Sequence, residues 1–225
     1  MEMQSKQVKG FTLIELLIVI GIIAILATVV ILTLNPAELL RQARDSTRTS
    51  DFATIKSAVS LFGADVATSS AAYGASILAA GPLPTCYVSI TQGAAQSGGA
   101  APVWGANCGG RFTTRGVAAN WTIASSSETN KRLVNGGGWI PINLNAISSG
   151  APISAWPVDP VSPNASTSYY AYATDGSGGF EINGVLESTK FASSSANDGG
   201  DMNAVGGPVG TSLLYEVGTQ PGLNL

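Results

Sequence analysis

One carboxylate stands near the start of a long apolar stretch. Glu15 is the only charged residue between Phe11 and Leu34. An acid in hydrocarbon costs roughly 2.5 to 3.5 kcal/mol, so such a residue is functional by default and needs a partner. A cut between Gly10 and Phe11 would give Phe11 a new α-amine, one helical turn from Glu15. The spacing therefore indicates a carboxylate that lacks a partner before cleavage and can pair with an amine afterwards.

The stretch from Phe11 to Leu34 has the length of a transmembrane helix. About 24 residues extend about 36 Å as an α-helix, enough to cross a hydrocarbon core of about 30 Å. The residues before it include Lys6 and Lys9, and no small-residue cleavage site follows the apolar region, so an ordinary secretory signal fits poorly. The alternative is a plain anchor in which Glu15 reaches the membrane interface.

The sequence KGFTLIE at positions 9–15, followed by an apolar helix, resembles the class III signal of type IV prepilins and type II secretion pseudopilins. This resemblance implies cleavage after Gly10 by prepilin peptidase, N-methylation of Phe11, and pairing of Glu15 with the terminal amine of a neighbouring subunit. It implies identical subunits and an inner-membrane assembly platform as partners. It also implies a precursor in the cytoplasmic membrane, with its head outside the cytoplasm, and then an extracellular filament.

Composition argues against catalysis and nucleic-acid binding. The chain has a formal charge of -3 and no histidine. Removing Glu2, Lys6 and Lys9 takes away a net +1 and leaves -4, which is unfavourable for binding phosphates. Without histidine the commonest general base is missing, and no nucleophile elbow, Walker loop or C-x-x-C motif occurs. We expect a protein that is not an enzyme and requires no cofactor.

The region after the span predicts a second helical stretch. Asn35 could cap a new helix with Pro36 at its first position, or Pro36 could kink one continuous helix. Apolar residues then recur at helical spacing and Gly63 is a plausible stop. These apolar residues are Phe52, Ile55, Val59 and Phe62.

Three arginines lie just beyond the span, at Arg41, Arg44 and Arg48. They could meet lipid head groups or acids on neighbouring subunits. A solvated helix face is the alternative.

The remaining sequence predicts one head domain with a small antiparallel sheet. Strand-like runs occur at 86–90, 121–123, 139–142, 169–173 and 180–182, separated by turn-forming residues. Tyr170 and Tyr172 alternate with alanines, so one strand face could place aromatic rings against the helix. Asp175 and Gly176 predict a hairpin turn. The order of these segments from Trp156 onward is similar to the head of major pseudopilins and of some bacterial pilins.

We therefore expect an α+β fold, which by resemblance is a pilin-like ladle: a long N-terminal helix packed on a small antiparallel sheet with long Gly/Ser-rich loops. The expected parts are a leader (1–10), a transmembrane and assembly half-helix (11–34), an amphipathic half-helix (35–63) and a globular head (64–225).

Two further sites are expected in the head. Cys86 and Cys108 are the only cysteines, and an even count in an extracytoplasmic chain favours a disulfide over two buried thiols or half a metal site. Asp198, Asp201 and Asn203 cluster oxygen ligands that could suit calcium. The same residue types also form ordinary tight turns.

Three functions fit these observations. The first is a structural subunit of a type IV pilus-like filament. The second is a pseudopilin of a type II secretion or DNA-uptake system. The third is a monomeric, membrane-tethered adhesin or binding module.

Overall fold

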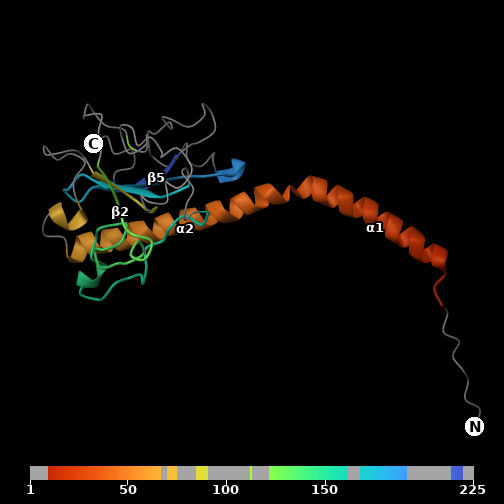
Figure 1. Ribbon diagram of the computed structural model, residues 1–225, viewed down its shortest axis with the longest axis horizontal. Helices are drawn as coiled ribbons and strands as arrows, with labels where there is room; N and C mark the ends of the chain where they lie inside the picture. Colours follow the sequence, from red (N-terminus) through yellow and green to blue (C-terminus); the bar gives the residue numbers. More distant parts are fainter. Residues whose placement is uncertain are drawn as a thin grey trace, which may run out of the picture. The chain divides into compact units, whose positions relative to one another are not determined.

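The computed structural model describes residues 10–66, 70–74, 85–90, 112, 122–161, 168–191 and 214–219. The chain divides into two compact units, Met1–Leu40 and Arg41–Leu225. Figure 1 shows two long helices followed in sequence by a head built around a sheet. The α+β layout expected from the sequence is confirmed.

The first helix, α1 (Leu13–Leu34), is apolar on every side. Within the described part of the chain it is the one helix long and apolar enough to cross a membrane, over Leu13–Ile31. Its side chains are exposed along that length, so the helix buries no face within its own unit. An apolar helix of this length needs lipid or other helices around it.

The second helix, α2 (Pro36–Asp65), starts directly after a break at Asn35. Asn35 has φ 38°, a left-handed conformation that ends α1, and its side-chain Oδ1 accepts a hydrogen bond from the Glu38 backbone N–H at 3.4 Å. Of the two arrangements that the sequence allowed, the structure has two helices with Pro36 at the first position of the second. The helix continues two residues past Gly63.

The apolar stripe expected on α2 is confirmed. Its four predicted members, Phe52, Ile55, Val59 and Phe62, are all buried. They pack against aromatic side chains of the sheet, and the rings of Phe52 and Tyr170 lie 4.8 Å apart in an edge-on contact.

The sheet contains five strands in the order β2-β1-β3-β4-β5. Four of them, β1, β3, β4 and β5, pair antiparallel as expected, and β2 adds to β1 in parallel. Neither the parallel pairing of β2 nor the strand β5 was expected from the sequence. The strands are β1 (Thr85–Val88), β2 (Thr122–Ser125), β3 (Ala171–Thr174), β4 (Phe180–Val185) and β5 (Leu214–Gly218), and two short 3-10 helices are η1 (Ser70–Tyr73) and η3 (Leu144–Ala146).

The β3–β4 hairpin forms at the predicted turn. The Asp175 side-chain Oδ1 accepts backbone N–H bonds from Ser177 at 2.6 Å and Gly179 at 2.8 Å. Gly176 and Gly178 have φ of 75° and 102°, values that favour glycine. The resulting register places Tyr170 and Tyr172 in the cluster with α2, while Ala171 and Ala173 join a second cluster with Cys86 and Val88.

The prediction of a strand at 139–142 is wrong. Trp139, Ile140 and Ile142 are at most 1% exposed, but this segment forms bends and leads into η3 rather than pairing in the sheet. Pro141 has no N–H to donate to a strand ladder. The Trp139 backbone N–H instead donates to the Lys131 carbonyl at 2.9 Å, and its indole N–H donates to the Pro157 carbonyl at 2.9 Å.

Candidate processing and assembly site

The predicted cleavage point lies in exposed, non-helical chain. Gly10, Phe11 and Thr12 precede the first residue of α1, and all three are exposed. Thr12 has φ -81° and ψ 150°, an extended conformation. The Gly10–Phe11 peptide bond therefore lies two residues before the helix, in exposed chain.

Thr12 and Glu15 form a reciprocal cap at the start of α1. The Thr12 backbone N–H donates to Glu15 Oε2 at 2.9 Å, and the Thr12 hydroxyl donates to the same oxygen at 2.7 Å. In return the Glu15 backbone N–H donates to Thr12 Oγ1 at 3.3 Å. This is a capping box, which satisfies two backbone donors that the first helical turn cannot.

The capping box corrects the interpretation that Glu15 lacks a partner before cleavage. Its carboxylate already accepts two hydrogen bonds from the same chain and lies at the positive end of the α1 dipole. Thr12 was not singled out from the sequence, although threonine followed by glutamate three residues later is the pattern that identifies a capping box. Glu15 therefore has a helix-starting role that does not depend on processing.

A second polar site holds α2 to the head. Arg48 is fully buried and its guanidinium donates to Asp159 from Nε at 2.8 Å and from Nη2 at 3.1 Å. Its Nη1 donates to Asp45 at 2.7 Å, and its Nη2 also donates to Glu187. Arg44 donates to the other oxygen of Glu187. We call these five residues the Arg48 cluster.

Asp45 ties the segment that follows β4 to α2 through hydrogen bonds to the backbone. Its carboxylate accepts the Glu187 N–H at 3.0 Å and the Ser188 N–H at 2.7 Å. Asp45 is also the first buried residue along α2, followed by Arg48, and the apolar stripe begins at Phe52. The N-terminal part of this contact is thus made by charges and the rest by hydrophobic packing.

Hydrogen bonds set the charge state of this site. Burial alone would raise the pKa of Asp45, but bonds from Ser188, Glu187 and Arg48 outweigh it and lower the pKa. Burial likewise opposes ionisation of Glu187, yet the bonds from Arg44 and Arg48 lower its pKa. Burial would lower the pKa of Arg48, and its carboxylate partners raise it instead. Asp45, Glu187 and Arg48 are therefore ionised at neutral pH.

The structure corrects the hypotheses for two of the three arginines. Arg48 is neither on a solvated helix face nor turned toward lipid, because its partners are acids of its own head. Arg44 is half-buried and bonds the same head through Glu187. Neither of these ion pairs needs a neighbouring subunit.

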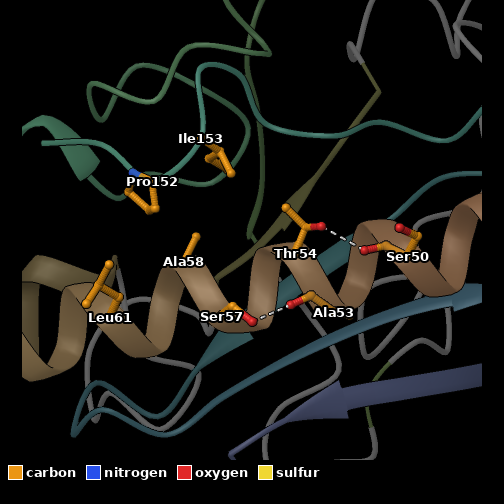
Figure 2. Close-up of a pocket in the computed structure, with 8 residues that line it drawn as sticks. All are labelled: Ser50, Ala53, Thr54, Ser57, Ala58, Leu61, Pro152 and Ile153. Carbon is orange, nitrogen blue, oxygen red and sulfur yellow. Dashed lines mark hydrogen bonds between the residues drawn. The ribbon is translucent and has the colours of Figure 1, made fainter.

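An apolar groove lies along the C-terminal half of α2. It has a volume of about 440 Å³, and its lining residues are Ser50, Ala53, Thr54, Ser57, Ala58 and Leu61 of α2 together with Pro152 and Ile153 (Figure 2). The hydroxyls of Thr54 and Ser57 donate to carbonyls of their own helix at 2.9 and 2.8 Å. No lining residue is charged, so the groove offers no acid, base or metal ligand.

The other predicted site residues are only partly described. Cys86 is buried in β1, but Cys108 lies outside the described residues, so their pairing stays a prediction. Asp198, Asp201 and Asn203 also lie outside them, and calcium binding there stays a prediction. Among the residues that the structure does describe, no group of three or more His, Cys, Asp or Glu side chains could hold a metal ion.

Comparison with known proteins bears on the N-terminal site. The family model for the prokaryotic N-terminal methylation motif matches residues 5–31, which contain Gly10, Phe11, the capping box and most of α1. No curated protein and no solved structure matches the chain at a significant level. The motif and the apolar helix suit a membrane-anchored precursor. Residues 5–31 are thus a class III signal peptide, the kind found in type IV pilins and pseudopilins.

Proposed function

We propose that this protein is a structural subunit of a type IV pilus-like filament. In this proposal prepilin peptidase cuts between Gly10 and Phe11 and the new N-terminus is methylated. An inner-membrane assembly platform then moves the subunit from the cytoplasmic membrane into a helical homopolymer on the cell surface. The protein itself catalyses no reaction.

The observation that carries the proposal is the methylation motif in register with the start of α1. The motif covers residues 5–31, and the capping box fixes the helix start two residues after the expected cut. Glu15 then lies one turn inside an apolar helix, where a second subunit's terminal amine is a fitting partner. The exposed surface of α1 supports the proposal too, since helices of other subunits could replace lipid around it.

Intact mass and N-terminal sequencing of the mature protein test the proposal. The expected result is a chain that begins at Phe11 and carries one additional methyl group. A Gly10→Ala variant should keep the full-length mass, because in this proposal the peptidase accepts only glycine, the residue without a side chain, before the cut. A wild-type chain that retains residues 1–10 in its native host would rule the proposal out.

A pseudopilin is the second candidate, supported by the order of elements in the head. The segment from Trp156 to Asp159 is followed by β3, a turn and β4. This order is similar to the head of major pseudopilins and of some bacterial pilins. Electron microscopy of sheared cell-surface material, with mass spectrometry of its subunit, separates the two. Long extracellular filaments made of this chain indicate a pilin, and their absence from secreting cells that contain mature protein indicates a pseudopilin.

A further inference from the structure

The turn at positions 135–138 has the sequence Asn-Gly-Gly-Gly, in which an asparagine directly precedes a glycine. Asn135 is exposed, and its side-chain Oδ1 accepts a hydrogen bond from the Gly137 backbone N–H at 3.0 Å. Gly136 has φ 88°, a conformation that favours glycine. We propose that Asn135 is a site of spontaneous chemical modification, at which the asparagine converts to aspartate and isoaspartate.

The reacting groups belong to adjacent residues. The Gly136 backbone nitrogen attacks Cγ of Asn135, and the new C–N bond closes a succinimide ring. The bond from Cγ to Nδ2 breaks, and Nδ2 leaves as ammonia together with the proton of the Gly136 nitrogen. A water molecule then opens the ring at one of its two carbonyl carbons, which yields aspartate or isoaspartate. The net reaction takes up one water and releases one ammonia.

The conformation of the turn favours this attack. The bond from the Gly137 N–H is made to Oδ1, the oxygen on which negative charge develops when Cγ is attacked. The same bond holds the Asn135 side chain against the backbone that follows it. No hydrogen bond of the Gly136 N–H is found among the residues that the structure describes, and Gly136 has no side chain to shield its nitrogen.

A second Asn-Gly pair in the chain provides an internal comparison. Asn183 and Gly184 lie in β4, and Asn183 is fully buried. The Asn183 Nδ2 donates to Glu181 Oε1 at 3.1 Å, and its strand pairs with β3 on one side and β5 on the other. Attack at Asn183 therefore requires that the sheet opens first. We expect Asn183 to convert more slowly than Asn135 by more than about tenfold.

Conversion at Asn135 changes the turn in two ways. Either product adds one negative charge to an exposed position. Isoaspartate also lengthens the backbone by one carbon atom, in a turn that is closely packed. A Cβ added at Gly138 would lie 2.0 Å from the Leu133 carbonyl oxygen and 2.8 Å from Trp156 Cδ1. The isoaspartate form should therefore be less stable than the aspartate form.

Ageing of the full chain in detergent measures the conversion. The protein is incubated at mildly alkaline pH in water labelled with heavy oxygen, and samples are returned to ordinary water before digestion. Chymotrypsin places Asn135 and Asn183 in different peptides, and mass spectrometry follows the replacement of each amide by a carboxyl group with one heavy oxygen. The same chain in guanidinium is the matched control, because both sites are then exposed to solvent.

In the folded chain, Asn135 should gain the label more than about tenfold faster than Asn183. In guanidinium, the two sites should react at similar rates. Asn135→Gln, which would have to close a larger ring, should lose the label at this position and keep the slow reaction at Asn183. Equal rates at the two sites in the folded chain would overturn the proposal. A rate at Asn135 that is tenfold lower in the folded chain than in guanidinium would also overturn it, since the turn would then protect the residue.

The effect of isoaspartate on stability has its own variant. Asn135→Asp carries the additional charge without the longer backbone, and it should unfold at the same guanidinium concentration as fresh wild type. Aged protein that contains isoaspartate should unfold at a lower concentration. Equal midpoints for aged and fresh wild type would exclude the strain that we assign to the longer backbone.

Discussion

Arg48 and Asp159 form a two-point ion pair in the interior of the head, although 111 positions separate them in sequence. Both side chains are at most 2% exposed. Two parallel N–H···O bonds fix the orientation of both groups, so the loop that contains Asp159 can meet α2 in one register only. The pair therefore determines where this loop lies on the helix.

Replacing Arg48 with Met should destabilise the head strongly. The substitution leaves the buried carboxylates of Asp45 and Asp159, and the partly exposed carboxylate of Glu187, without their shared cation, and breaking such a cluster costs about 3 to 5 kcal/mol. Guanidinium unfolding of the full chain in detergent, followed by the fluorescence of buried Trp139 and Trp156, measures the loss. Lys56→Met, at an exposed position of the same helix, is the matched control and should change stability by less than about 0.5 kcal/mol. Similar losses in both variants would contradict the role of the cluster.

The free energy of unfolding should fall in acid. The pKa values of Asp45 and Glu187 are lowered in the folded state, so their contribution is fully present above their unfolded values of about 3.9 and 4.3. It is lost as the pH drops through the lower folded values, because the folded protein must then take up protons. Unfolding experiments at several pH values between 7 and 2 should show this decline.

Two variants check the sign of that pH dependence. Asp45→Asn removes one of the titrating groups and should make the decline shallower. Burial raises the pKa of Asp51, whose carboxylate accepts the Tyr170 hydroxyl at 2.8 Å, so Asp51 contributes in the opposite direction. Asp51→Asn should therefore make the acid decline steeper. A stability that rises on acidification in the Asp51→Asn variant would exclude this account.

Glu15→Ala should leave membrane insertion intact and impair assembly. The apolar surface of α1 is unchanged, whereas a buried terminal amine would lose its counter-charge at a cost of about 3 to 5 kcal/mol. Immunoblots of membrane and sheared fractions measure the two steps separately. Glu38→Ala, which removes an acid from the first turn of α2, is the control. Normal filament yield from Glu15→Ala would refute the assembly role.

Cys86 and Cys108 should be oxidised in mature protein from the cell surface. On the loop-entropy model their disulfide would stabilise the head by about 3 kcal/mol. A free-thiol assay in denaturant should detect no reactive thiol before reduction and two thiols after it. Cys86→Ser and Cys108→Ser should lower stability equally, and detection of two free thiols without reduction would disprove the pairing.

Short sequence patterns predicted those elements that depend on residues close together in the chain. The spacing from Phe52 to Phe62 identified the buried face of α2, and the alternation at Tyr170 and Tyr172 identified the face of β3 that meets it. The KGFTLIE motif identified the N-terminal site for the same reason. In each case the pattern and the structure involve the same short segment.

The features that the sequence did not predict depend on contacts between residues that are distant in the chain. Arg48 binds Asp159 and Glu187, which lie 111 and 139 positions away, and nothing near Arg48 in the sequence indicates burial. The parallel pairing of β2 with β1 likewise joins distant segments. The run at 139–142 is as apolar as a buried strand, but Pro141 interrupts it, and the segment bends and leads into η3 instead of pairing in the sheet.

Both ends of α1 are closed by residues next to them. Thr12 and Glu15 cap its start, and the left-handed Asn35 ends it. Helix ends usually depend on caps, and here the caps belong to the segment itself. Residues 10–35 therefore contain both caps of α1. When this segment is fused to an unrelated domain, the helix should still begin at Leu13 and end at Leu34. The head domain could therefore change in evolution while the sequence of this N-terminal segment stays the same.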